Sequence, residues 1–178
     1  MKRGGLSLPS TPCAPNRPYT QKALSGPGWT FPPYSDIMHL MCDYSFIEQP
    51  IPDEISQITD LYRSENWWKQ EGDNPEMTRL IVTGSHCFLV ARHEGRIIGM
   101  GRAVSDGASD AYLQDVTVMD SFRGNGIGTR IVETLIGRLE RDGIHWIGLI
   151  AEKGSHPFYE RLGFSIMERA TPMLRVKR

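Results

Sequence analysis

The stretches that decide the fold are Tyr112-Leu113-Gln114-Asp115-Val116-Thr117-Val118 and, four residues later, Arg123-Gly124-Asn125-Gly126-Ile127-Gly128-Thr129-Arg130. The first stretch contains aromatic and β-branched residues, which predicts a β-strand. The second is a glycine-rich turn that leads into a helix, because apolar residues then recur at every fourth position, at Ile127, Ile131, Leu135 and Leu139. A strand, a glycine turn and a helix therefore follow one another directly.

This succession builds a cradle for an anion. Gly124, Gly126 and Gly128 let the backbone pass close to a ligand, because a glycine carries no Cβ. The free N–H groups of the first helical turn point at that ligand, and the helix dipole adds positive potential behind them. We therefore expect residues 123–129 to bind a pyrophosphate.

Two familiar phosphate loops do not match these residues. A Walker loop needs a lysine followed by serine or threonine after its last glycine, whereas Gly128 is followed by Thr129-Arg130. The dinucleotide fingerprint is G-x-G-x-x-G, whereas the glycines here are spaced G-x-G-x-G. Both motifs fit poorly.

A third pattern fits better. Arg123, Gly126 and Gly128 match R-x-x-G-x-G, and a second signature stands in Pro157-Phe158-Tyr159-Glu160-Arg161-Leu162-Gly163-Phe164. In this order, with one predicted strand between them, the two motifs resemble the GCN5-related N-acetyltransferase (GNAT) superfamily. The resemblance covers the chain from about Asp43 to its C-terminus. It implies acetyl-coenzyme A as the acetyl donor.

The resemblance also implies which residues hold the donor. They are Val116, Thr117, Val118, Arg123, Gly124, Asn125, Gly126, Ile127, Gly128, Thr129, Ser155 and Phe158. The backbone of Val116 and Val118 would hydrogen-bond the pantetheine arm, in the manner of an added strand. Many members carry an asparagine before the tyrosine helix, and here Ser155 or a main-chain group would have to replace it.

Acetyl transfer makes two chemical demands. An alkylamine with a pKa near ~10.4 is mostly protonated at neutral pH, so its attack needs a base or a water chain to one. Coenzyme A then departs as a thiolate, to which a nearby phenol can donate a proton. By the resemblance, Tyr159 lies beside the thioester sulfur and is the expected general acid. The alternative is a tyrosine that only packs its ring under the donor.

Asp115 is the second catalytic candidate. It stands at the bend of the fourth strand, where glucosamine-phosphate acetyltransferases carry E-D-V, but here Gln114 replaces the glutamate. Asp115 is therefore either a base or a residue that only caps the bend. The expected acceptor-binding residues are Gln114, Trp67 and Trp68, because the first two helices of the family border the site of the acceptor amine. Burial of the two tryptophans in the core or in a dimer contact is an equal alternative.

The remaining sequence predicts an α/β fold. We expect strands at 44–48, 87–91, 97–101, 112–119, 145–151, 164–168 and 173–176, and helices that begin at Pro52, Pro75, Ile127 and after Ser155. This is a mixed, splayed β-sheet flanked by helices in the order β-α-α-β-β-β-α-β-α-β-β, as the resemblance implies. Residues 1–40 are rich in proline and glycine and are expected to be a flexible tail, with the N-acetyltransferase domain at 41–178.

Composition narrows the range of partners. The chain has 178 residues, 39% of them hydrophobic, and a formal net charge of −1. It therefore has no overall positive electrostatic field that would attract nucleic acid. No run of about 18 apolar residues predicts a membrane span. Three cysteines without metal-ligand spacing indicate reduced thiols, a cytoplasmic location and no metal site. A homodimer is left open.

The sequence thus predicts an N-acetyltransferase that moves acetyl from acetyl-coenzyme A to a primary amine by direct attack in a ternary complex. The acceptor is expected to be a small molecule. A protein lysine or N-terminus is the alternative within the enzyme class, and a non-catalytic acyl-coenzyme A sensor is the alternative outside it.

The tail gives the first testable expectation. A truncated chain that starts at Met38 should keep its melting temperature and its affinity for acetyl-coenzyme A, because residues 1–35 cannot supply a core. Thermal unfolding and calorimetric titration measure both quantities. A large loss of either would show that the tail docks on the domain, with Trp29, Phe31 and Tyr34 as its apolar anchors.

Overall fold

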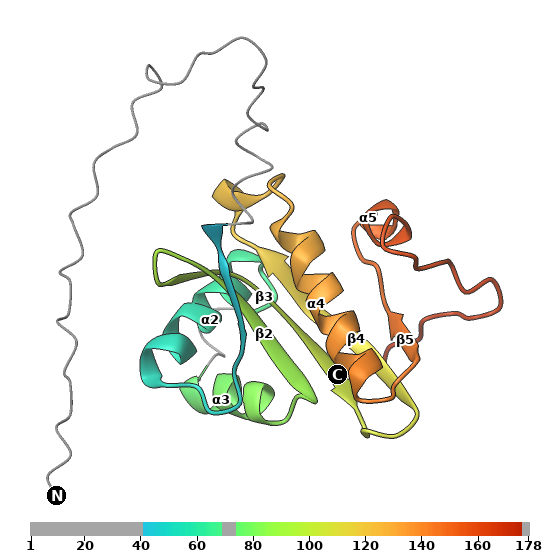
Figure 1. Cartoon of the computed structure of the whole chain (residues 1–178), viewed down its shortest axis with the longest axis horizontal. Helices are drawn as coiled ribbons and strands as arrows, with labels where there is room; N and C mark the ends of the chain where they lie inside the picture. Colours follow the sequence, from blue (N-terminus) through green and yellow to red (C-terminus); the bar gives the residue numbers. More distant parts are fainter. Residues whose placement is uncertain (1–40, 69–73, 176–178) are drawn as a thin grey trace, which may run out of the picture. The chain divides into compact units, whose positions relative to one another are not determined.

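The computed structural model describes residues 41–68 and 74–175. The predicted tail, residues 1–40, lies outside the described residues. The described part is an α/β domain in which helices cover both faces of a central sheet (Figure 1). The α/β class predicted from the sequence is confirmed.

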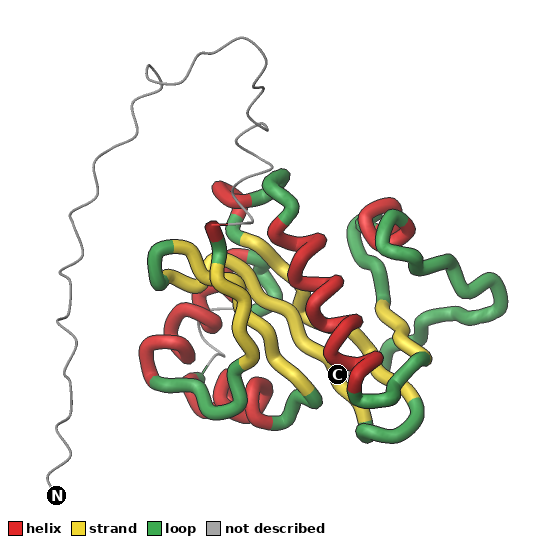
Figure 2. The backbone as a smooth tube through the Cα atoms, viewed as in Figure 1, coloured by secondary structure: helices red, strands yellow, loops and turns green. Residues whose placement is uncertain are grey.

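One mixed sheet of five strands forms the centre (Figure 2). Its strands are β1 (Asp43–Phe46), β2 (Cys87–His93), β3 (Arg96–Ser105), β4 (Asp110–Val118) and β5 (Trp146–Leu149). They lie side by side in chain order. The first four pair antiparallel, whereas β5 runs parallel to β4, because helix α4 carries the chain back across the sheet between them.

The helices form a layer on each face. They are α2 (Pro52–Ser64), α3 (Pro75–Thr83), α4 (Ile127–Arg141) and α5 (His156–Glu160), with a 3₁₀ turn η2 (Asp120–Phe122). Helices α2 and α3 pack against β3 and β2, and α4 packs against β2, β3 and β4. None of the helices in the described part of the chain is long and apolar enough to cross a membrane.

Strand β2 shows why the sheet is covered on both faces. Its side chains alternate between two apolar clusters: Leu89 and Ala91 join the cluster under α4, whereas Phe88 and Val90 join the cluster under α2. All four are buried. A strand that buries both faces reads as a continuous apolar run rather than an alternating one, as Cys87–His93 does at its start.

Strand β4 bends in the middle. Gly101 of β3 stands opposite two residues of β4, Asp115 and Val116, because the pairing register shifts by one residue there. Asp115 has φ 55°, a left-handed conformation that is rare outside glycine. Pairing with β5 ends at Leu113, so the half of β4 beyond the bend has a neighbouring strand on one side only.

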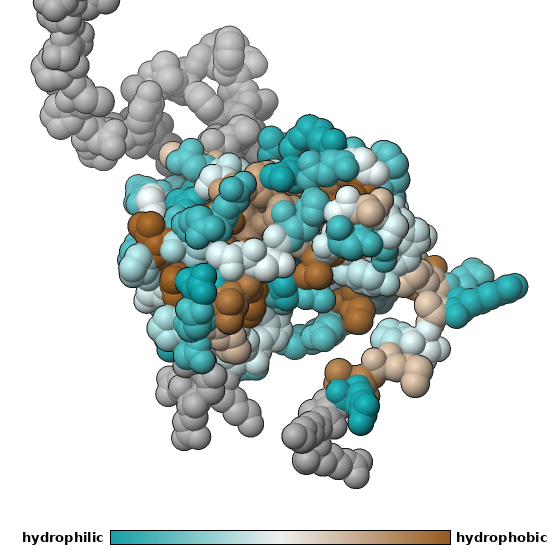
Figure 3. Space-filling model, turned by 90° about the horizontal axis from the view of Figure 1, so that it is seen from below, coloured by the Kyte–Doolittle hydropathy of each residue, from teal (hydrophilic) through white to brown (hydrophobic). Residues whose placement is uncertain are grey.

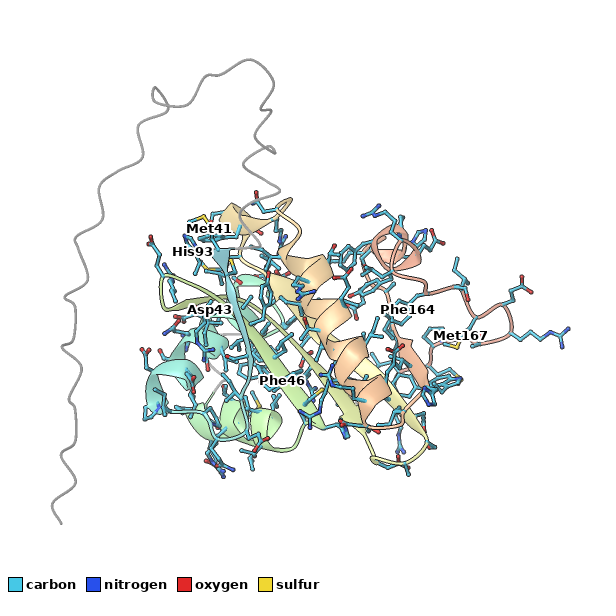
Figure 4. The ribbon with its side chains drawn as sticks, in the orientation of Figure 1. Met41, Asp43, Phe46, His93, Phe164 and Met167 are labelled. Carbon is cyan, nitrogen blue, oxygen red and sulfur yellow. The ribbon has the colours of Figure 1, made fainter. Side chains whose placement is uncertain are left out.

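The last two predicted strands, 164–168 and 173–176, are wrong: no strand follows α5 in the described residues. Phe164 still packs on the core, but the segment then leaves the domain, and Met173 is 93% exposed. Figure 4 labels Phe164 and Met167 on this segment. The apolar pattern that predicted these strands cannot provide a partner edge, and a strand without one leaves its backbone groups to water.

Hydrophobic residues also reach the surface elsewhere. Figure 3 shows them on one face as separate patches between hydrophilic residues. Exposed examples include Ile51 and Leu80, which are each more than half exposed. Single apolar residues at the surface are ordinary, and the fold rests on the two buried clusters.

Gly101 tests the packing of α4 on the sheet. A Cβ added there would lie 2.8 Å from Cγ2 of Ile131 and 3.1 Å from Cδ1 of Leu135. Gly101→Ala should therefore destabilise the domain by about 1–3 kcal/mol through overpacking. Gly137→Ala, inside α4, would place a Cβ in ordinary contact with Nη1 of Arg141 at 3.6 Å and should stabilise by about 0.5–1 kcal/mol. Urea unfolding measures both, and equal effects of the two substitutions would contradict the close contact.

Candidate functional site

A cleft of about 960 Å³ opens where β4 loses its partner. Its walls come from four parts of the chain: the residues after α2, strand β4, the turn that opens α4, and the segment around α5. This volume is in the range of small-molecule and cofactor sites, ~300–1,000 Å³. The cleft therefore gathers segments that are far apart in the sequence.

The glycine turn forms one end of the cleft. Gly124 and Gly126 have φ 77° and 75°, conformations that favour glycine, and Gly126 is the N-cap of α4. Within the described part of the chain, no side-chain hydrogen bond caps this helix end, and its first turn holds no acidic residue. The first turn of α4 thus leaves its N–H groups without partners inside the helix. Its residues Ile127, Gly128 and Thr129 line the cleft.

Asn125 does not line the cleft, although the sequence placed it with the donor-binding residues. Its side chain turns back and donates hydrogen bonds from Nδ2 to the carbonyls of Phe122 and Arg123, both 3.0 Å long. This closes the turn from behind. The Asn125 side chain therefore holds the turn, and its place among the donor-binding residues stays a prediction.

Arg123 lines the cleft, but its guanidinium is already engaged. Nε donates to the carbonyl of Val118 at 2.8 Å, and Nη2 donates to Glu65. Nη1 lies 2.9 Å from Asp120. The side chain is nevertheless 52% exposed, so an anion in the cradle has access to it.

The bend of β4 is held by a polar cluster. Arg102 donates from Nη2 to Gln114 at 2.6 Å and from Nε to Asp115 at 2.5 Å. The Tyr62 hydroxyl donates to the same oxygen of Asp115 at 2.7 Å. Burial, together with the charge of Asp115, raises the pKa of Tyr62, so this phenol stays a donor. A single carboxylate oxygen of Asp115, Oδ2, thus accepts both of these hydrogen bonds.

The two tryptophans separate. Trp67 lines the cleft and is 37% exposed. Trp68 does not line it; its ring stacks on Tyr62 with the centroids 4.2 Å apart, and it packs against the cluster under α2. Trp68 is thus partly buried, and its contacts support Tyr62, the residue that hydrogen-bonds Asp115.

Tyr159 and Phe158 form the wall opposite β4. Burial raises the pKa of Tyr159, so its phenol is protonated throughout the neutral range. The Phe158 ring lies against the glycine turn, 3.6 Å from where a Cβ on Gly128 would be. Ser155 lines the cleft and is the N-cap residue of α5, as expected from a helix that begins after it, but its side chain forms no capping hydrogen bond.

Glu65 is a charged cleft residue that the sequence analysis did not identify. It stands at the C-terminal end of α2, and its Oε1 accepts a 2.6 Å hydrogen bond from Thr117 and another from Arg123. The only signal in the sequence was its position two residues before Trp67. Its contact with β4 joins residues that are 52 positions apart in the sequence, and periodicity does not encode such a contact.

In the described residues, no group of three His, Cys, Asp or Glu side chains is placed to hold a metal.

Known proteins resemble this chain over part of its length. "GCN5-related N-acetyltransferase 2, chloroplastic" of Arabidopsis thaliana is 40% identical over 73 residues, which is 41% of this chain and 28% of that protein. Serotonin N-acetyltransferase 2 of Oryza sativa is 38% identical over 72 residues, 40% of this chain and 36% of that protein. The chain thus spans about a third of the length of these curated relatives.

Solved structures share the fold. A GNAT family acetyltransferase of Streptococcus pneumoniae aligns with a TM-score of 0.65 at 23% identity, over 78% of this chain and 99% of that one. An acetyltransferase of Clostridium acetobutylicum, determined with acetyl-CoA, aligns with a TM-score of 0.61 at 18% identity, over 75% and 96%.

The family itself is identified by sequence. The model of the acetyltransferase (GNAT) family matches residues 46–164, which is more than half of the chain and includes β4, the glycine turn and Tyr159. Members of this family use acyl-coenzyme A donors. The chain therefore belongs to the acetyltransferase (GNAT) family.

Proposed function

We propose that this protein transfers the acetyl group of acetyl-coenzyme A to the primary amine of a small molecule, with both substrates bound at once. One observation carries the proposal: the glycine turn, the unpaired half of β4 and Tyr159 line a single cleft. The turn suits a pyrophosphate, the strand edge suits an amide-containing arm, and the phenol suits a departing thiolate.

The residues present fit the donor. Gly124 and Gly126 adopt the positive φ that a tight phosphate-binding turn requires, and no side-chain cap competes for the N–H groups of α4. Val116 and Val118 stand beyond the end of β5, where a second partner for the backbone of β4 is missing. The donor supplies the activated acetyl group, and these residues bind and orient it.

Direct transfer is supported by the position of the thiols. Cys42 and Cys87 are buried, and neither lines the cleft; Cys13 lies outside the described residues. Burial raises the pKa of Cys87 to about 11, so it is a thiol rather than the nucleophilic thiolate at neutral pH. An acyl-enzyme on either described cysteine is therefore disfavoured.

The acceptor distinguishes the alternatives. Trp67 presents an apolar ring to the cleft and Glu65 a carboxylate, a combination suited to a small amine with an apolar body. Among the relatives, one is named a histone acetyltransferase and another a serotonin N-acetyltransferase. Protein acetylation is thus the alternative reaction, and a non-catalytic acyl-coenzyme A sensor is the alternative outside catalysis.

One screen separates these functions. The full-length protein is incubated with acetyl-coenzyme A and a panel of small amines, lysine peptides and N-terminal peptides, while free thiol is measured. Thiol released faster with a small amine supports the proposal. Release with peptides alone would favour protein acetylation, and tight donor binding without turnover would favour the sensor.

Cellular location and domain limits stay predictions. We expect residues 41–178 to be the catalytic domain, residues 1–40 to be dispensable for it, and the protein to be cytoplasmic. Three of the relatives are named chloroplastic, which describes those proteins. Fractionation of cells that express the tagged protein would decide the location.

Gly126 tests the donor site. Gly126→Val should abolish binding of coenzyme A, because a β-branched side chain at φ 75° displaces the turn and projects toward the phosphates. Gly107→Val is the matched control: Gly107 has φ 78° and lies in the hairpin between β3 and β4, away from the cleft. Calorimetry should find normal affinity in the control, and normal affinity in both variants would refute the assignment.

Tyr159 tests the general acid. Tyr159→Phe keeps the ring and removes the hydroxyl, so kcat should fall by ~10²–10⁴-fold while donor affinity changes little. Because burial raises the pKa of Tyr159, the alkaline limb of the wild-type pH–rate profile should lie above pH ~10 and vanish in the variant.

Tyr44→Phe provides the control for this experiment. Among residues 41–68 and 74–175, its buried hydroxyl has no hydrogen-bond partner and does not line the cleft, so kcat should not change. Nearly full kcat in Tyr159→Phe would show that the thiolate leaves without this proton.

A further inference from the structure

Glu65 brings a carboxylate into the cleft from outside the two sequence motifs. Its side chain is 16% exposed, and its Oε1 accepts hydrogen bonds from Thr117 and Arg123. Thr117 belongs to the half of β4 that has no β5 partner, so Glu65 lies at the open strand edge. This edge is also where the proposed donor arm would lie.

Asp115 is the other carboxylate of this strand, and it is held more firmly. Both of its partners, Arg102 and Tyr62, donate to Oδ2, and the Arg102 side chain is only 16% exposed. Arg102 is also fixed by Gln114. Asp115 therefore serves the bend of β4, and its carboxylate cannot change partners without loss of that cluster.

The partner of Glu65 is different. Arg123 is 52% exposed and stands at the start of the glycine turn, so a phosphate in the cradle competes with Glu65 for its guanidinium. The Arg123 half of this ion pair is solvated, so its guanidinium can exchange Glu65 for a phosphate, whereas the Glu65 carboxylate is only 16% exposed and keeps its hydrogen bond from Thr117. Donor binding would thus leave Glu65 with Thr117 as its remaining partner.

We propose that Glu65 is the proton acceptor for the attacking amine, and that it becomes available when the donor phosphates engage Arg123. This inference rests on the proposed acetyltransferase function and names the base that the two motifs lack. It predicts ordered binding, with the donor before the acceptor.

Every proton of the proposed acetyl transfer has a donor and an acceptor. The acceptor arrives as R–NH₃⁺ and gives one proton to the Glu65 carboxylate, which frees the nitrogen lone pair. The C–N bond forms and the C–S bond breaks, the second nitrogen proton passes to water, and the thiolate receives a proton from Tyr159. Glu65 and Tyr159 then exchange protons with water, so the net products are the amide, the free thiol and one released proton.

Other charges act on Glu65 from each side. Arg123 and Asp120 come from the turn, and Asp115, with Arg102 and Tyr62 bonded to it, comes from the bend of β4. The cleft lining also includes Tyr159, Arg161, Glu152 and Lys153. Cations and anions thus balance around the cleft, and Arg123 is the charged group bonded directly to Glu65.

Glu65→Gln is the test, because glutamine keeps the shape and still accepts hydrogen bonds from Thr117 and Arg123. With the best small amine of the panel, kcat near pH 7 should fall by ~10²–10⁴-fold, and the acidic limb of the kcat profile should disappear. A β,β-difluorinated analogue of that amine is much less basic and depends less on a base. Its kcat should therefore fall much less in Glu65→Gln than the kcat of the parent amine. Affinity for coenzyme A should stay equal or rise up to about fivefold, because Arg123 is released from an ion pair.

Glu54→Gln is the matched control. Glu54 pairs with Arg92 at the other end of α2, and its side chain is 19% exposed, close to that of Glu65. It does not line the cleft. We expect a similar change of melting temperature in both variants and an unchanged kcat in Glu54→Gln.

Two results would overturn the inference. If Glu65→Gln lowers kcat equally at every pH and for both amines, or weakens coenzyme A binding in step with its melting temperature, Glu65 only holds the turn. If kcat is unchanged at every pH, another group takes the proton. Wild-type turnover in the same assay keeps these outcomes separate from failure of the acetyltransferase function itself.

Discussion

The bend of β4 at Asp115 is the constraint on which the site depends. Before it, β4 pairs with β5; after it, residues 116–118 have a strand on one side only. A regular strand at this place could extend the parallel ladder and satisfy those backbone groups internally. The bend instead turns them toward the cleft, together with the glycine turn that follows. The cleft and the strand geometry are thus one feature.

The bend is strained, and the helices on both faces hold it. A non-glycine residue in the left-handed region costs on the order of 1–3 kcal/mol. On one face, Tyr62 of α2 bonds to Asp115, and Trp68 stacks on Tyr62. On the other, Gly101 lets Ile131 of α4 approach the sheet opposite the bend. Core packing away from the cleft therefore offsets a strain located beside it.

The sequence predicted what is local and periodic. Helix α4 and the glycine turn follow from spacing alone, and Tyr159 follows from a motif of adjacent residues. The strands expected after Phe164 failed, because apolar alternation does not say whether a partner edge exists. Glu65 was missed for a related reason: its place beside Thr117 is set by how α2 packs on the sheet. Contacts of this kind depend on the assembled fold.

Two arginine–carboxylate pairs flank β4, and solvent gives them different roles. Arg102 is mostly buried and bridges Asp115 and Gln114; removal of one partner from such a pair leaves a poorly solvated charge, which favours keeping the cluster intact. Arg123 is half exposed, and water compensates for a lost partner there. The same two residue types thus fix backbone shape at the bend, while near the glycine turn they leave a carboxylate that a bound anion can release. Exposure, rather than residue identity, makes the difference.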